Sequence, residues 1–166
     1  MKKIAFIVQR YGFEVNGGAE LHCRQLAEHL PKNQYDVTVL TNKAIDYMTW
    51  KDEYKADEEE LNGIHVKRFS VKKPRNLKEF NKINDEFFSG KIAHTEREQE
   101  WLEKQGPLMP SLLQYLSDHK DDYDVFIFFT YLYYPTVMGI NIVGDKAIVI
   151  PTAHDEPFLQ MDMYRN

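Results

Sequence analysis

The chain has 166 residues, of which 43% are hydrophobic and 28% charged, and it carries a formal net charge of −5. This length and composition are typical of one ordinary globular domain. The negative charge gives no overall reason to expect nucleic acid, because binding to phosphate backbones requires a basic surface. Since Cys23 is the only cysteine, an intramolecular disulfide is excluded.

The first half of the chain alternates between strand and helix patterns. An apolar run at residues 3–8 predicts a strand covered on both faces, as parallel sheets require. Residues 14–32 then predict a helix that turns Cys23 toward the core and ends at Pro31. Short β-branched runs at residues 35–41 and 63–71 predict two more strands. Residues 44–60 show no clear periodicity, so we expect a loop there.

The second half begins with helical patterns and then returns to strands. Helices are predicted at residues 76–88, 94–105 and 111–119, and strands at residues 123–129 and 146–152. Residues 125–143 carry no charge and approach the length of a membrane span. Thr130, Pro135 and Asn141 interrupt this run, so we expect a strand, a turn and a helix with Pro135 near its first turn.

This order of elements, with strands that are apolar throughout, predicts an α/β fold: a doubly wound, mostly parallel sheet with helices on both faces. The sequence stops a few residues after a strand, so we expect residues 1–166 to be a single domain that is truncated. In such sheets, ligands bind outside the carboxyl ends of the strands.

The adjacent glycines Gly17 and Gly18 open the predicted first helix. The first backbone N–H groups of a helix have no internal partner and, with the helix dipole, they attract anions. Glycine lets a phosphate approach them without meeting a Cβ atom, whereas the structural alternative is a tight turn with close packing. A dinucleotide fingerprint is absent because no third glycine has the right offset, and no Gly-Lys-Ser/Thr loop occurs.

Several of these segments together resemble a known family. The first strand, the loop, "GGAE" and the late strand running into "PTAHDE" resemble the N-terminal half of a retaining glycosyltransferase of family 4, which has the two-Rossmann-domain (GT-B) fold. The segments "EWLEKQGPLMPSLLQYL" and "YDVFIFFTYLYYPT" are similar to bacterial members that assemble polysaccharides. The resemblance covers essentially the whole chain and implies a Rossmann-like, acceptor-side domain. The C-terminal donor-binding domain has no counterpart here, so we expect this chain alone to be inactive.

The resemblance also implies roles for particular residues. Gly17 and Gly18 would face the diphosphate of a nucleotide-sugar donor, and His154 would lie beside the transferred sugar as the catalytic residue. The enzyme would be a hexosyltransferase that uses the nucleotide-sugar as substrate, with no cofactor and no metal. Its acceptor would be a glycan or a lipid-linked glycan of surface polysaccharide biosynthesis. We therefore expect a cytoplasmic location, and we expect no nucleic acid among its partners.

Two further segments are candidates for acceptor or membrane contacts. Tyr131, Tyr133 and Tyr134 follow the fourth strand, and such rings suit contact with sugars, although core packing is the alternative. Residues 72–82 concentrate five basic side chains in an acidic chain. This segment suits contact with anionic lipid head groups at the inner face of the membrane, and a solvated helix face is its alternative.

Two other patterns resemble metal sites but are not expected to bind a metal. "DYD" at residues 122–124 imitates the Asp-x-Asp motif of metal-dependent sugar transferases, but it precedes a strand and so belongs to the amino edge of the sheet. His22 and His29 share a helix face without a third ligand. The alternative function, from a different class, is a non-catalytic Rossmann-like binding module whose glycines only shape a turn.

Overall fold

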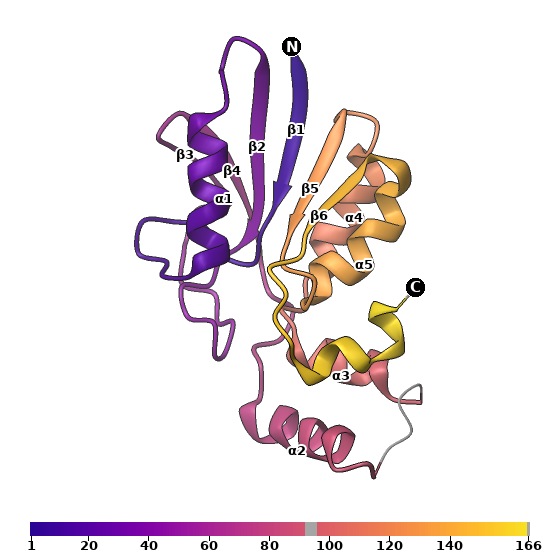
Figure 1. Ribbon diagram of the computed structural model, residues 1–166. Coiled ribbons are helices and arrows are strands. Elements are labelled where there is room, and N and C mark those ends of the chain that lie inside the picture. The colour runs from indigo at the N-terminus through magenta and orange to yellow at the C-terminus, as the bar shows by residue number, and fades with distance from the viewer. Residues whose placement is uncertain (92–95, 166) are drawn as a thin grey trace.

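The computed structural model describes residues 1–91 and 96–165, which contain one six-stranded sheet in the order β3–β4–β2–β1–β5–β6 (Figure 1). All neighbouring strands are parallel except β3 and β4. The fold is therefore α/β, doubly wound and Rossmann-like, as predicted. Its strands are β1 (Lys2–Ile7), β2 (Tyr35–Asn42), β3 (Glu58–Leu61), β4 (Ile64–Phe69), β5 (Val125–Phe129) and β6 (Ala147–Ile150).

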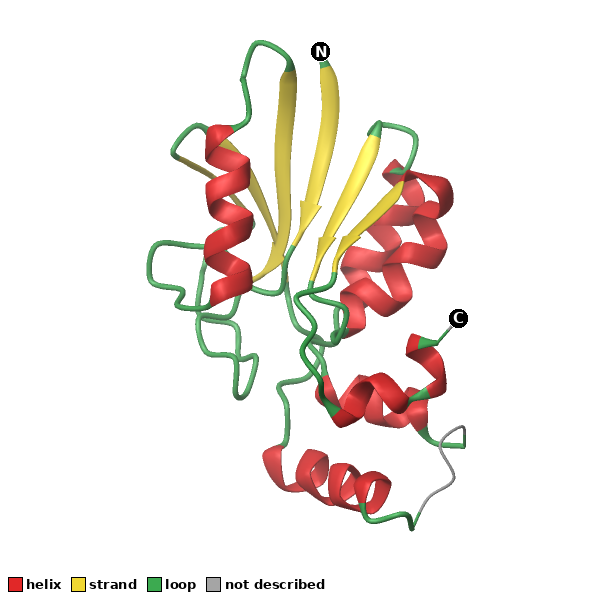
Figure 2. Ribbon diagram, in the orientation of Figure 1, coloured by secondary structure: helices red, strands yellow, loops and turns green. Residues whose placement is uncertain are grey.

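Helices cover both faces of this sheet (Figure 2). One face packs on α1 (Gly18–His29), and the opposite face packs on α4 (Pro110–His119) and α5 (Tyr134–Val143). Alternate side chains of β1 separate accordingly: Ile4 and Phe6 join the cluster that contains Cys23, whereas Ala5 and Ile7 join the cluster beneath α4 and α5. This two-sided burial explains why the central strands read as continuous apolar runs.

A third layer lies beyond the carboxyl ends of the strands (Figure 1). It contains α2 (Leu77–Phe88), α3 (Glu98–Gln105) and two short 3₁₀ turns, Pro157–Gln160 and Asp162–Tyr164. Their apolar side chains gather around Trp101, which is fully buried. The three predicted helices between residues 76 and 119 are confirmed, although residues 94 and 95 of the second lie outside the described residues.

The expectation of a loop over residues 44–60 is wrong at its end. Glu58–Leu61 forms β3, which pairs antiparallel with β4 through a two-residue turn. Asn62 and Gly63 occupy this turn with φ values of 51° and 72°, the left-handed conformation that short hairpins require. The strand escapes prediction because its sequence, "EEEL", lacks the β-branched residues that mark strands.

The uncharged run at residues 125–143 divides between β5 and α5, as predicted. Pro135 lies in the first turn of α5, where its missing N–H costs no helical hydrogen bond. Within the described residues, no helix is both long enough and apolar enough to cross a membrane.

Candidate functional site

A pocket of about 380 Å³ opens at the carboxyl edge of the sheet, between β1 and β5. At this point the strand order reverses direction, since β1 is followed outward by β2 on one side and by β5 on the other. Such a switch point is where doubly wound sheets bind ligands. The lining residues are Gln9, Arg10, Asn16, Gly17, Gly18, Ala19, Glu20, Tyr47, Thr130, Tyr133, Thr152 and His154.

Four of the six residues predicted from the sequence line this one pocket. Gly17 and Gly18 come from the start of α1, Tyr133 follows β5, and His154 follows β6. The buried side chain of Gln9 connects two of these segments, because its Nε2 donates to the carbonyl oxygen of Phe129 over 2.7 Å. The fold thus gathers predicted site residues that lie up to 137 positions apart.

The two glycines differ in what surrounds them. A Cβ atom on Gly17 would overlap the Glu20 carboxylate and would lie 3.1 Å from Nη2 of Arg10. A Cβ atom on Gly18 would meet nothing within 4 Å among the described residues. Gly17 is therefore explained by close packing within the chain, whereas Gly18 leaves the first turn of α1 open to the pocket. Within the described chain, no side chain caps this helix end.

Sequence reasoning missed the ion pair that shapes this end of the pocket. Nη2 of Arg10 lies 2.8 Å from Oε1 of Glu20, and the two side chains are only 7% and 12% exposed. The same guanidinium donates to the carbonyl oxygens of Ile45 and Asn16, at 2.7 and 2.8 Å. Arg10 therefore joins the loop after β1, the loop after β2 and the first turn of α1. No spacing rule signals this pair, because its geometry depends on the loops.

Tyr47 is a second lining residue that the sequence did not single out. The residue is 53% exposed, and Cζ of the Arg10 guanidinium lies 5.3 Å from the centroid of its ring. Nη1 of Arg75 donates to the Tyr47 carbonyl oxygen over 3.3 Å, and Nε of Arg75 donates to Gln105 over 2.8 Å. Burial lowers the pKa of Arg75 to about 10, so the side chain stays charged at neutral pH. Arg75 thus fixes the Tyr47 loop against α3.

The three predicted tyrosines have different surroundings. Tyr133 faces the pocket and packs edge-on against Trp50, and burial raises the pKa of its phenol, which therefore remains a neutral hydrogen-bonding group. Tyr131 lines a separate cavity of about 370 Å³ and packs edge-on against Tyr164. Tyr134 is 6% exposed and belongs to the cluster around Trp101. Only Tyr133 therefore reaches the pocket.

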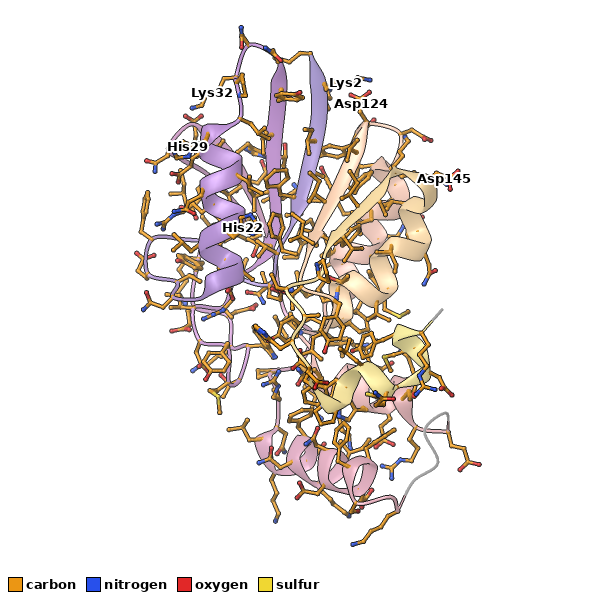
Figure 3. All side chains as sticks on the ribbon, viewed as in Figure 1. Lys2, His22, His29, Lys32, Asp124 and Asp145 are labelled. Carbon is orange, nitrogen blue, oxygen red and sulfur yellow. The ribbon has the colours of Figure 1, made fainter. Side chains whose placement is uncertain are left out.

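The "DYD" segment lies at the opposite edge of the sheet, as predicted (Figure 3). Asp124 pairs there with Nζ of Lys2 at 2.9 Å and accepts the backbone N–H of Lys3 at 2.8 Å. These contacts tie the start of β5 to the start of β1. His22 and His29 are both exposed on α1, and neither is among the residues that line the pocket. Across residues 1–91 and 96–165, no three His, Cys, Asp or Glu side chains gather as metal ligands.

No protein-family model matches the chain, and no curated protein or solved structure matches it significantly. The fold and the pocket are therefore the physical basis on which a function can be argued.

Proposed function

We propose that the chain is the acceptor-side domain of a retaining GT-B glycosyltransferase of family 4, which transfers a sugar from a nucleotide-sugar to a glycan or lipid-linked acceptor. The observation that carries this proposal is the convergence of Gly18, Tyr133 and His154 on one pocket at the switch point of the sheet. The enzyme would take part in the synthesis of a bacterial surface polysaccharide, in the cytoplasm at the inner face of the membrane. A partner domain would bind the nucleotide and complete the enzyme.

The electrostatics of the pocket suit this chemistry. In glycosyl transfer, the bond between the sugar C1 and the diphosphate oxygen breaks, and negative charge grows on the leaving diphosphate. The uncapped N–H groups at the start of α1 are fixed donors that stabilise such charge without reorganisation. The new bond forms between C1 and an acceptor hydroxyl oxygen, whose proton passes to the leaving diphosphate. This arrangement needs no resident metal ion from this domain, which stays a prediction.

His154 and Tyr133 would act on the sugar side of the pocket. His154 is exposed in the loop after β6, where its imidazole can hydrogen-bond a sugar hydroxyl or stabilise charge near C1. Tyr133 offers an aromatic edge and a phenol, which suit contact with a sugar ring. In this proposal, His154 is the catalytic residue, and Tyr133 contributes to acceptor binding.

One observation favours the alternative, a non-catalytic binding module. The chain's own Glu20 carboxylate lies over Gly17, so this glycine is accounted for without any ligand. The phosphate assignment therefore depends on Gly18, and substitution at this position separates the two functions.

We expect Gly18→Leu to weaken binding of nucleotide-sugars about tenfold or more, because the new side chain covers the free N–H groups of α1. Binding is followed by NMR through the amide resonances of residue 18 and Ala19 in the parent and in each variant during titration with UDP-glucose and GDP-mannose. The space beside Gly18 is open, so the melting temperature should stay within about 2 °C of the parent. Gly18→Ala serves as the smaller matched change. If Gly18→Leu binds as the parent does, the phosphate assignment to Gly18 is wrong and the binding-module alternative replaces the enzyme.

We expect His154→Ala to lower transfer by the full-length enzyme about 100-fold, a loss typical for one group that stabilises a transition state. The assay follows release of the nucleoside diphosphate from the donor in the presence of an acceptor glycolipid extract. His29→Ala is the matched control, since His29 is an exposed histidine at the last position of α1 and does not line the pocket. An equal loss in both variants, or none in either, would remove His154 from the catalytic site.

A further inference from the structure

Two threonines at the ends of neighbouring strands form a pair within the same pocket. Thr130 directly follows β5, and Thr152 lies two residues after the end of β6. Both residues line the pocket, and their hydroxyl oxygens are 3.0 Å apart. In the sequence, Thr130 is prominent only as an interruption of an apolar run, and Thr152 has no predicted role.

The backbone of both threonines is strained. Thr130 has a φ of 71° and Thr152 a φ of 46°, in the left-handed region where a β-branched residue is a genuine outlier. Of the four described non-glycine residues with positive φ, these two line the pocket. Glycine would adopt this conformation without strain. Strained residues cluster at ligand sites, where the side chain has a use that outweighs its cost.

The surrounding contacts hold this strained backbone in place. The N–H of Thr130 donates to the carbonyl oxygen of Ile150 over 2.9 Å, and the N–H of Tyr131 donates to that of Pro151 over 3.1 Å. The carbonyl oxygen of Thr130 accepts the hydroxyl of Thr136 over 2.7 Å. The threonine pair is therefore fixed by two strands and by the first turn of α5. It is positioned before any ligand arrives.

The hydrogen-bonding capacity of the pair suits a hydroxyl ligand. One hydroxyl donates to the other, so one O–H group and at least one lone pair remain for a ligand, whichever threonine is the donor. A sugar hydroxyl both donates and accepts, and it can satisfy both positions. An ionised phosphate only accepts, and the N–H groups of α1 on the same pocket serve it better.

We propose that Thr130 and Thr152 form the subsite that recognises a hydroxyl group of the transferred sugar, while the first turn of α1 receives its phosphate. This inference rests on the proposed function and adds two positioning and specificity-determining residues to it. The strain at both positions is retained because glycine, the residue that the backbone prefers, would remove the two hydroxyl groups.

The test uses the 166-residue chain with the α-1-phosphates of glucose, galactose and mannose, and with inorganic phosphate as the sugar-free probe. Affinities are measured by NMR titration. We expect at least one hexose 1-phosphate to bind about threefold to tenfold more tightly than phosphate, as one or two hydrogen bonds allow. Thr130→Gly and Thr152→Gly should abolish this preference and leave phosphate affinity unchanged, whereas Thr152→Ser should keep it.

Stability provides a second readout, which tests the backbone strain separately from ligand binding. Each glycine variant should melt about 2–4 °C above the alanine variant at the same position, because glycine relieves the backbone and alanine does not. If the hexose preference survives in both glycine variants, or if glycine melts below alanine, the threonine subsite is overturned while phosphate binding at Gly18 stands. If phosphate itself fails to shift Gly18 and no hexose 1-phosphate binds, both the subsite and the proposed function are overturned.

Discussion

Replacing Glu20 by alanine should lower the free energy of unfolding by about 3–5 kcal/mol, the cost of leaving a buried charge without its partner. Arg10 is 7% exposed on its side chain and has Glu20 as its ion-pair partner, with 2.8 Å between Nη2 and Oε1. The guanidinium would keep its hydrogen bonds to the carbonyl oxygens of Ile45 and Asn16. These bonds do not neutralise the charge, so the loops around the pocket would loosen.

Urea unfolding of the parent, Glu20→Ala, Glu20→Leu, Arg10→Met and the double variant Arg10→Met/Glu20→Leu measures this effect. The double variant should lie within about 1–2 kcal/mol of the parent, since a buried ion pair replaced by apolar side chains of similar volume is often nearly neutral. The cycle then gives the coupling between the two charges. A loss below about 1 kcal/mol in Glu20→Ala, the value typical of exposed pairs, would show that water reaches this pair.

Much of the fold follows from local patterns. Apolar or β-branched runs marked the five strands that pair in parallel, and Pro135 marked the start of α5. The general rule that ligands bind at the carboxyl ends of strands predicted that Gly18 and His154 lie at the same edge of the sheet, and both line one pocket there. The turn Asn62–Gly63 was also readable, since an Asn-Gly pair is a strong hairpin signal, and it would have revealed β3.

The rest of the site depends on the geometry of loops, and no regular spacing of residues in the sequence predicts that geometry. Arg10 and Glu20 meet because the loop between β1 and α1 folds back on itself. The ring of Tyr47 reaches the pocket through the contacts of Arg75 with Gln105, a residue of α3. The strain at Thr152 arises where the chain leaves β6, and nothing in "PTAHDE" announces it.

Replacing Trp101 by alanine should lower the free energy of unfolding by about 3–5 kcal/mol, the usual cost of removing a large buried ring. Trp101 is fully buried, and its Nε1 donates to Oδ1 of Asn84 in α2 over 3.1 Å. Its ring lies 5.4 Å from that of Phe158, in the first of the two 3₁₀ turns. The indole therefore joins α3 to α2 and to the segment after β6.

The loss of stability in Trp101→Ala should also affect the pocket, because the segment after β6 carries His154. Two backbone N–H groups of the second 3₁₀ turn donate to the Glu98 carboxylate of α3, at 2.8 and 2.9 Å. If α3 loosens, these anchors loosen too, and the His154 loop samples more conformations. Amide hydrogen exchange should therefore speed up first in α2 and in residues 151–164, and later in the sheet.

Trp50 can report on the loosening of α3, because its Nε1 donates to the carbonyl oxygen of Gln105 over 2.9 Å. In Trp101→Ala it is also the only tryptophan, so the fluorescence comes from it alone. Its fluorescence should shift toward that of exposed indole at lower urea than in the parent. Trp101→Phe keeps most of the packing and should lose about half as much stability. Two results together would contradict this coupling between the cluster around Trp101 and the pocket. They are a free energy of unfolding of Trp101→Ala within about 1 kcal/mol of the parent value, and unchanged amide exchange in residues 151–164.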